Sequence, residues 1–473
     1  MSTRSRSPPT PPAQDEPAPK RQRVEEPAQP VEAVAETEVK QSTKRKRTLP
    51  YERGMHLAPM VRIGTLPVRL MALEYGAELV WGPEIVDKAL IGSERKVDEQ
   101  SGVVSFVKNG RSIFECHPVE KPRLIFQLGS ASPELAVQAL KVIEGDVGGV
   151  GLNCGCPKAF SLQGGMGAAL LKDPERLCSI LRALVASTDL PIDAKIRLLP
   201  LPKEPKEASS APSSAPSTAS TPATDPSPAP STSATPTSTA PASPSDSPAP
   251  PSEPLVPPTL LIPPTATPSP SEPTLPLVAQ ILDTGISNLT VHCRTQEMRS
   301  SEPALHERMR EITRMGAERG IPVVCNGDVL GGGIEADWGN VKEIAEKTGV
   351  TSVMIARAAE SNTSCFSKTG LKDPITEVIP RLIKLGIATG NHYNNTKYIL
   401  NALDLYQSPS PPTREKNREL KLKMNKAKTY EAMGEVFGIS KDEVEALRKT
   451  RVEELLPAWG ERRKVIAEEE GKQ

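Results

Sequence analysis

The sequence predicts a (β/α)8 barrel, an α/β fold in which eight parallel strands close into a ring. Eight short apolar runs recur between residues 55 and 357, and stretches with helical periodicity lie between them. Parallel strands need a crossover between each pair, and crossover helices cover the sheet, so this alternation favours a closed parallel barrel. A doubly wound open sheet is the structural alternative.

The predicted strands and helices follow one another in regular order. The strand candidates are MHLAPM (55–60), ELVWG (78–82), LIFQLG (124–129), GVGLN (149–153), IDAKI (192–196), LTVHC (289–293), PVVCNG (322–327) and SVMIAR (352–357). The helix candidates between them are Leu66–Tyr75, Pro133–Glu144, Pro174–Leu184, Leu275–Asp283, Leu305–Arg319 and Val341–Lys347.

One long interruption falls inside the predicted barrel. Residues 201–272 are Pro, Ser, Thr and Ala repeats without periodicity, which predicts a disordered insertion after the fifth strand. The helical pattern resumes afterwards and leads to the sixth strand, so the crossover is only lengthened. The cost of closing a surface loop grows with the logarithm of its length. We therefore assign the barrel to residues 51–200 and 273–372.

Segments of different character flank the barrel. Residues 1–50 are rich in Pro, Ser and charge, which predicts a disordered tail. Its basic clusters, Lys20–Arg23 and Lys44–Arg47, fit a nuclear import signal, a phosphate-contacting arm or solvated charge. Residues 373–473 form a predicted helical domain and tail. Its helix candidates are Ile375–Leu385, Lys397–Tyr406, Glu415–Lys428, Tyr430–Phe437 and Lys441–Leu456.

The composition limits the class of protein. Lys and Arg number 58, as do Asp and Glu, so any nucleic-acid binding has to come from local basic patches. The seven cysteines are an odd number without a regular framework, which fits a reducing compartment. No apolar run reaches membrane-spanning length and the N-terminus does not resemble a secretory signal. We expect a soluble protein of the cytoplasm, the nucleus or both, without a membrane partner.

Candidate site residues, most of them polar, gather where the predicted strands end. They are Pro59 and Met60, Gln127, Asn153 with Cys156, Lys195, His292, Asn326-Gly327-Asp328 and Ala356-Arg357. In a barrel these strand ends share one rim, where active sites lie. Polar side chains in apolar strands are unfavourable unless they face partners or a ligand.

The types of residue at this rim indicate a phosphorylated ligand. The last two strands of a barrel often precede a phosphate site, and the amides and Lys195 would suit a heteroaromatic ring. Flavin mononucleotide (FMN) satisfies this description, as does a phosphorylated sugar or nucleotide substrate. No Gly-x-Gly-x-x-Gly sequence opens a helix, so a Rossmann-type NAD site is not supported.

Cys156 is the candidate catalytic residue. It follows a strand, next to Pro157, and a Gly-Gly-Met-Gly segment comes soon after it, which suggests a thiol held in an open loop. An unperturbed thiol is mostly protonated at neutral pH and can act as a general acid. A buried structural cysteine is the alternative. Cys154 and Cys156 form a Cys-x-Cys sequence of the kind that can bind a metal ion. No second cluster in the sequence supplies the other two of four ligands, so we expect no metal here.

Several ordered motifs together resemble the tRNA-dihydrouridine synthases. The motifs are APM (58–60), NCGCPKAFSLQGGMGAALL (153–171), AKIR (194–197), VHCRT (291–295), NGD (326–328) and ARA (356–358). The sequences LAPMVRIGTLPVRLMALEYGAELV and GNHYNNTKY are most similar to the eukaryotic class that reduces uridine 20 in the tRNA D-loop. Cys293 departs from the family, which usually has glycine or another small residue at this place.

The resemblance implies an activity and a set of ligands. It implies a barrel that holds FMN and takes hydride from NADPH or NADH, followed by a helical domain that binds tRNA. Hydride would pass to C6 of a flipped-out uracil, and Cys156 would protonate C5 from the opposite face. The implied flavin contacts are Pro59, Met60, Val61, Gln127, Lys195, His292, Asn326, Gly327, Asp328, Ala356 and Arg357.

The same resemblance suggests contacts with the RNA substrate. Those near the uracil or the flavin are Glu84, Asn153 and Arg294, and those in the helical domain are Asn394, Asn395 and Lys397. A basic run follows them along a predicted helix, from Arg414 to Lys428, and would contact phosphates. An amphipathic helix with a solvated face is the alternative. Two further functions stay open: an FMN-dependent reductase or dehydrogenase of a free small molecule, and a non-catalytic RNA-binding protein.

Overall fold

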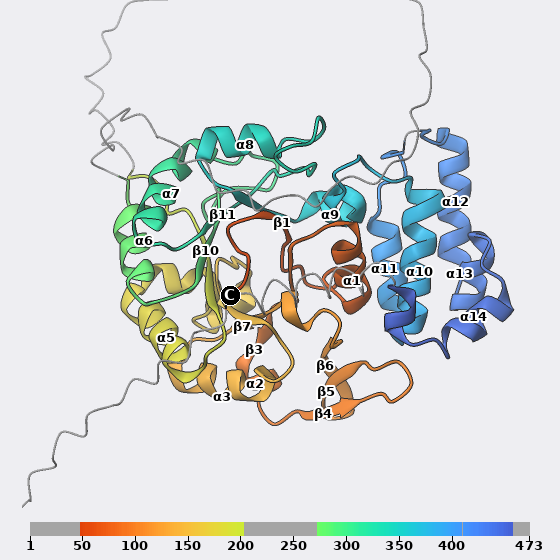
Figure 1. Ribbon diagram of the computed structural model, residues 1–473, viewed down its shortest axis with the longest axis horizontal. Helices are drawn as coiled ribbons and strands as arrows, with labels where there is room; N and C mark the ends of the chain where they lie inside the picture. The colour runs from red at the N-terminus through yellow and green to blue at the C-terminus, as the bar shows by residue number, and fades with distance from the viewer. Residues whose placement is uncertain (1–47, 203–271, 409, 457–473) are drawn as a thin grey trace, which may run out of the picture. The chain divides into compact units, whose positions relative to one another are not determined.

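The structure is a computed structural model that describes residues 48–202, 272–408 and 410–456 (Figure 1). The predicted disordered tail (1–50) and insertion (201–272) lie almost entirely outside the described residues. None of the described helices is long and apolar enough to cross a membrane.

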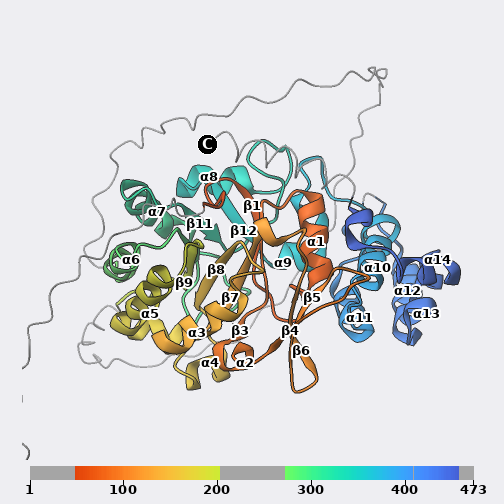
Figure 2. The same cartoon turned by 60° about the horizontal axis from the view of Figure 1, so that its bottom comes forward.

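Eight parallel strands close into the predicted barrel (Figures 1 and 2). They are β1 (Gly54–Leu57), β2 (Leu79–Trp81), β7 (Leu124–Gly129), β8 (Gly149–Cys154), β9 (Ile192–Arg197), β10 (Asn288–His292), β11 (Val323–Asn326) and β12 (Ser352–Ile355). Each strand pairs with its neighbours in the ring, and β2 pairs with β7 to close it. The closed barrel is therefore confirmed, and the open sheet is excluded. The chain leaves the described residues soon after β9, the fifth barrel strand, and returns before the sixth, as predicted.

Helices surround the ring. They are α1 (Leu66–Tyr75), α3 (Pro133–Ile143), α5 (Pro174–Ser187), α6 (Thr274–Leu282), α7 (Met309–Glu318), α8 (Val341–Thr348) and α9 (Arg357–Ser361), with two short helices, α2 (Asp87–Leu90) and α4 (Ala159–Gln163). Local sequence sets where they begin. The side chains of Ser132 and Asp173 accept N–H groups from the first turns of α3 and α5, and a proline follows each cap.

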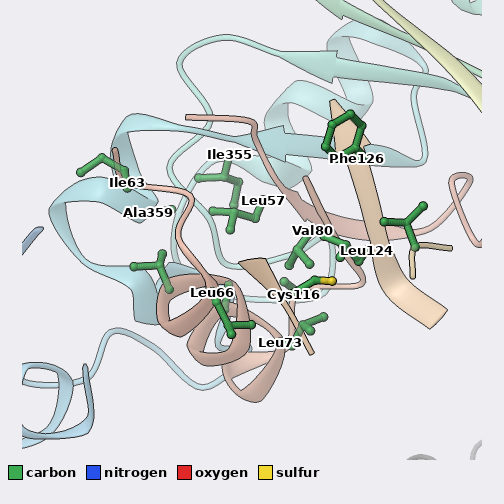
Figure 3. Packing of buried hydrophobic residues seen from close by; sticks show 14 of the residues in the cluster. Leu57, Ile63, Leu66, Leu73, Val80, Cys116, Leu124, Phe126, Ile355 and Ala359 are labelled. Carbon is green, nitrogen blue, oxygen red and sulfur yellow. The ribbon is translucent and has the colours of Figure 1, made fainter. Parts of the chain in front are cut away.

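The strands separate two hydrophobic layers because successive side chains point to opposite faces. One set fills the barrel and includes Leu79, Trp81 and Val324. The other set packs between the barrel and its helices. Figure 3 shows this outer layer beside α1, with Leu57 next to Ile355 and Val80 next to Leu124. Residues two apart on a strand thus share a layer, which decides the side chains that face the barrel interior.

A small antiparallel sheet follows β2 and was not predicted from the sequence. It consists of β4 (Glu94–Val97), β5 (Val104–Lys108) and β6 (Arg111–Cys116), and a two-residue strand, β3 (Ile85–Val86), pairs with β7. Asn109 and Gly110 connect β5 to β6 with positive φ angles of 52° and 71°. This Asn-Gly turn between apolar runs is a strong hairpin signal, so the hairpin could have been found in the sequence.

The C-terminal segment is helical, as predicted. One π-helical turn, η5 (Pro374–Val378), leads into α10 (Ile379–Ala388); then follow α11 (Tyr393–Ala402), α12 (Arg414–Lys426), α13 (Tyr430–Val436), α14 (Lys441–Leu447) and the 3₁₀ turn η6 (Val452–Leu455). α11 begins four residues earlier than predicted, because the His392 ring accepts the Asn394 N–H. α10 packs against α1, and Arg381 Nε lies 2.8 Å from Glu74 Oε2.

A buried ion pair joins α1 to the segment between β6 and β7. Arg69 and Glu120 are 1% and 0% exposed, and their closest side-chain N–O distance is 2.7 Å. Arg69 also donates to the carbonyl oxygens of Gly64 and Glu115. The guanidinium therefore ties the β1–α1 loop, the helix and the small sheet together.

Replacing Glu120 with alanine should lower the free energy of unfolding by about 3–5 kcal/mol, because Arg69 would remain buried without its counter-ion. Urea unfolding of the purified variant measures the loss. The control is Glu318→Ala, which breaks a solvent-exposed pair with Arg314 and should cost about 0–1 kcal/mol. Equal losses in the two variants would contradict this role for the buried pair.

Candidate active site

Strand register brings the predicted polar residues to one end of the barrel. Asn153 of β8 lies opposite Lys195 of β9. His292 of β10 lies opposite both Arg197 of β9 and Asn326 of β11. The side chains of these residues lie on the same face of the sheet as Val324, which belongs to the barrel-interior cluster. The rim predicted from strand ends is therefore formed by side chains of adjacent strands.

The turn that carries Cys156 is fixed on two sides. Asn153 Oδ1 accepts the N–H groups of Gly155, at 3.0 Å, and of Cys156, at 3.2 Å. Arg197 Nε donates to the Gly155 carbonyl at 2.8 Å, and its Nη1 donates to the Thr295 carbonyl at 3.1 Å. Cys156 itself is half-buried. Asn153 thus acts on the backbone of the turn that places the thiol.

Sequence reasoning missed Arg197 as a site residue. It is the third inward residue of β9, after Asp193 and Lys195, and all three are ionisable. An apolar strand with a charge at every second position is the signal that could have found it. Asp193 is fully buried below Lys195, and burial raises its pKa to about 7. A Cβ on Gly151 would lie 2.0 Å from Asp193 Oδ1, so this carboxyl group requires glycine on β8.

Glu84 lies beside the same turn, just after β2. Its carboxyl group interacts with Asn153 and Cys156, and burial is the main cause that raises its pKa. A Cβ on Gly129 would come within 2.8 Å of Glu84 Oε1, so glycine at the end of β7 allows this close approach. The structure thus brings Glu84 together with Asn153 and Cys156.

Two polar side chains at the rim, one buried and one half-buried, have no partner within the described ranges. Among the described residues, Lys195 Nζ and the Gln127 amide make no hydrogen bond or ion pair, although Gln127 is only 3% exposed. Burial, followed by the charge of Arg197, lowers the pKa of Lys195 to about 8. Burial, followed by the nearby cations, lowers the pKa of His292 to about 2, so this imidazole is neutral at physiological pH. Buried groups of this kind fit a ligand that supplies hydrogen-bond partners.

The loop after β11 has a conformation that depends on its glycine. Gly327 has a φ of 120°, and a Cβ there would lie 3.1 Å from Ala304 Cβ and 3.3 Å from His292 Cδ2. The next residue, Asp328, also has a positive φ, of 51°. Asn326 fixes the strand end, because its Nδ2 donates to the Met354 carbonyl at 2.8 Å.

Arginine side chains hold Asp328. Arg294 Nη2 donates to both carboxylate oxygens, at 2.5 and 2.6 Å, and Arg357 donates to one of them. Burial is the largest single influence on the pKa of Asp328 and raises it. The hydrogen bonds together outweigh burial, so the pKa is lowered. Arg294 is 4% exposed and also donates to the Glu302 carbonyl, whereas the Arg357 side chain is 56% exposed. Arg357 can therefore reach a ligand, whereas Arg294 is already hydrogen-bonded to Asp328 and Glu302.

The remaining predicted contacts lie at the ends of β1 and β12. Pro59 and Met60 are partly buried after β1, Val61 is exposed, and Ala356 precedes α9. The guanidinium of Arg62 lies 3.7 Å above the ring of Tyr398 on α11. The β1 end of the rim is thus in direct contact with the C-terminal helices.

The predicted RNA contacts of α11 differ in accessibility. Asn394 and Asn395 are exposed. Lys397 Nζ instead donates to the carbonyls of Asn425 and Ala427, at 2.7 and 2.8 Å, and so caps the end of α12. Lys421 caps α11 in return, through the Asn401 and Leu403 carbonyls.

The donor set at the rim fits FMN. The half-buried Lys195 and the buried Gln127 have no partner among the residues that the structure describes, and a heteroaromatic ring with acceptors and donors would satisfy both. Arg357 offers an exposed cation beside a glycine-bearing loop, which suits a phosphate.

Comparison with known proteins identifies the family of this chain. Residues 56–204 and 269–452 match the model of the dihydrouridine synthase (Dus) family. The chain belongs to this family. It is 39% identical, over 83% of its length and 66% of the relative's, to the tRNA-dihydrouridine(20) synthase of Schizosaccharomyces pombe. It is 32% identical to the protein of the same name from Saccharomyces cerevisiae, over 75% of the chain and 77% of that protein. The names of both relatives include NAD(P)+.

More distant relatives carry related names. The tRNA-dihydrouridine(20a/20b) synthase of Saccharomyces cerevisiae is 22% identical over 65% of this chain and 60% of its own. The chain spans just under two thirds of the length of the Schizosaccharomyces pombe relative. The resemblance to the dihydrouridine synthases that the motifs predicted is confirmed for the family.

Replacing Lys195 with methionine should stabilise the ligand-free protein at pH 7, since burial disfavours the ammonium ion. The folded-state pKa of about 8 lies below the ordinary value of 10.5, so the penalty is complete below pH 8 and disappears by pH 10.5. Urea unfolding at pH 7, 9 and 10 should show the variant's advantage shrinking as pH rises. Lys96→Met, at an exposed position, is the control and should show no such trend. A difference between the unfolding free energies of the variant and the wild type that does not change with pH would contradict the lowered pKa of Lys195.

Proposed function

We propose that this protein is a tRNA-dihydrouridine synthase. It reduces the C5–C6 double bond of uridine 20 in the tRNA D-loop, with FMN as cofactor and NADPH or NADH as reductant. Family membership and the names of the relatives support this function. The observation that carries it is the half-buried Cys156, held by Asn153 and Arg197 on the same rim as the unpartnered Lys195.

Cys156 acts as the general acid. FMN, when bound and reduced, supplies the hydride that C6 receives. Cys156 Sγ gives its proton to C5, so the double bond becomes a single bond and the sulfur becomes a thiolate that solvent reprotonates. Asn153 and Arg197 hold the turn in place while the proton moves. Glu84, whose raised pKa favours its protonated form more than usual, stands where it can hydrogen-bond to the uracil.

The other rim residues hold the cofactor. Gln127 and Lys195 would face its ring, with Lys195 as the donor to a ring acceptor, and His292, a neutral imidazole, would lie toward the phosphate. Pro59, Met60, Val61 and Ala356 line the adjacent strand ends. Asn326, Gly327 and Asp328 form the phosphate loop, together with Arg357. Arg294 positions Asp328 through its paired hydrogen bonds rather than binding the substrate directly.

The exposed face of α12 supplies the affinity for tRNA. Five basic residues on or just after this helix are exposed and form no ion pair among the described residues: Arg414, Lys416, Arg418, Lys426 and Lys428. Cations of this kind bind phosphates and release counter-ions. Asn394 and Asn395 are exposed on the neighbouring α11. Because Arg62 and Tyr398 join α11 to the catalytic rim, an RNA on these helices can reach the barrel.

The purified protein should be yellow, and Cys156→Ala should lower the rate of uridine reduction by about 10²–10⁴-fold, because the general acid is lost. NADPH should reduce the bound flavin of the variant at the normal rate. Stopped-flow reoxidation of the reduced protein by unmodified tRNA measures the chemical step.

The matched control is Cys178→Ala, which removes a buried thiol on α5 and should leave the rate unchanged. Full activity in Cys156→Ala would contradict the role of Cys156 as the general acid. A protein that takes up no FMN would contradict the proposal that FMN is the cofactor. Reoxidation of the reduced protein by small enones but not by tRNA would favour a reductase of a free small molecule.

Replacing Lys416 and Arg418 together with alanine should weaken tRNA binding and reduce the slope of log affinity against log salt by about 1 for each lost phosphate contact. Filter binding at several salt concentrations measures both quantities. The control is Lys342→Ala with Lys347→Ala, two exposed lysines of α8. Equal slopes for all three proteins would show that α12 does not contact the tRNA.

A further inference from the structure

Three metal-ligating side chains meet behind the phosphate loop. Cys293 follows β10, Cys325 lies on β11, and His306 opens the 3₁₀ turn η3 (His306–Arg308). One ligand atom from each lies within 4.8 Å of the other two, and the two sulfur atoms are 3.5 Å apart. Neither cysteine faces the barrel interior, because both pack in the outer layer between strands and helices.

The cluster is buried in apolar surroundings. Both cysteines are 0% exposed and His306 is 8% exposed. The neighbouring outward residues of the same strands are Val291 and Val323. Three polar groups in such a layer are unfavourable unless they satisfy one another or a bound ion. Neither the proposed reduction nor the proposed RNA binding uses them.

The orientation of His306 is that of a metal ligand. Its Nε2 lies 2.8 Å from the Gly327 carbonyl oxygen, which can only accept a hydrogen bond. Nε2 therefore carries the proton, and Nδ1 is the nitrogen left with a lone pair. Histidines that bind metals almost always donate their other ring N–H to a carbonyl or carboxylate in this way.

We propose that Cys293, His306 and Cys325 bind one Zn²⁺ ion. Two Zn–S bonds and one Zn–N bond form, and the protons of the thiols leave to solvent. With Zn–S bonds of about 2.3 Å, tetrahedral geometry places two sulfur atoms about 3.8 Å apart, which is close to the 3.5 Å present here. A small external ligand such as water completes the four positions.

Charge favours this ion. Two thiolates and a neutral imidazole balance Zn²⁺ to zero net charge, which suits an apolar layer, whereas Cu(I) would leave a negative site. The bound ion would tie the ends of β10 and β11 to η3, directly behind Gly327.

Metal analysis of the full-length, tag-free protein tests the site. Purified in a non-thiol reductant and equilibrated with equimolar Zn²⁺, the protein should retain about one zinc per chain after gel filtration. Cys325→Ser should lose it. The control Cys178→Ser changes a buried cysteine outside the cluster and should keep it. Because zinc is counted without any turnover, this result is independent of the proposed reaction.

A second measurement needs no variant. Adding Co²⁺ to the metal-free wild-type protein should produce a thiolate-to-cobalt charge-transfer absorption that Zn²⁺ abolishes. A wild-type protein that binds neither ion overturns the proposal. Copper in place of zinc, or a disulfide between Cys293 and Cys325 after purification without reductant and no bound metal, also overturns it.

Discussion

Closure of the eight-stranded ring is the constraint on which the site depends. Once β2 pairs with β7, every strand has one face inside the barrel and one face against the helices. Because successive side chains point to opposite faces, the place of a residue in its strand decides which face its side chain occupies. Lys195 has to share the interior with Asn153 and His292, and Cys293 has to join the outer layer. One geometric condition thus creates both the rim and the buried sulfur cluster behind it.

The interior also shows how the fold tolerates ionisable groups. Gly151 leaves room for the carboxyl group of Asp193, and Gly129 does the same for Glu84. Lys195 and Gln127 stay without partners in the described part of the chain, which destabilises the ligand-free protein in favour of binding. The loop at Gly327 is supported from the rim by Asp328 and from the outer layer by His306.

Much of this could be predicted from the sequence, and the reason is periodicity. Every barrel strand was found because apolar runs alternate with helical stretches, and rim residues were found because strand ends share one edge. The contacts of Lys397 and Arg294 could not be predicted, since they depend on partners brought close only by folding. The cluster of Cys293 and Cys325 was hidden for the same reason, because a separation of 32 residues matches no local ligand spacing.

Dihydrouridine mapping in tRNA from cells that lack this protein tests the central claim most directly. The account predicts that the modification disappears at position 20, persists at other positions, and returns when the wild-type protein is expressed again. Unchanged dihydrouridine at position 20 would contradict it.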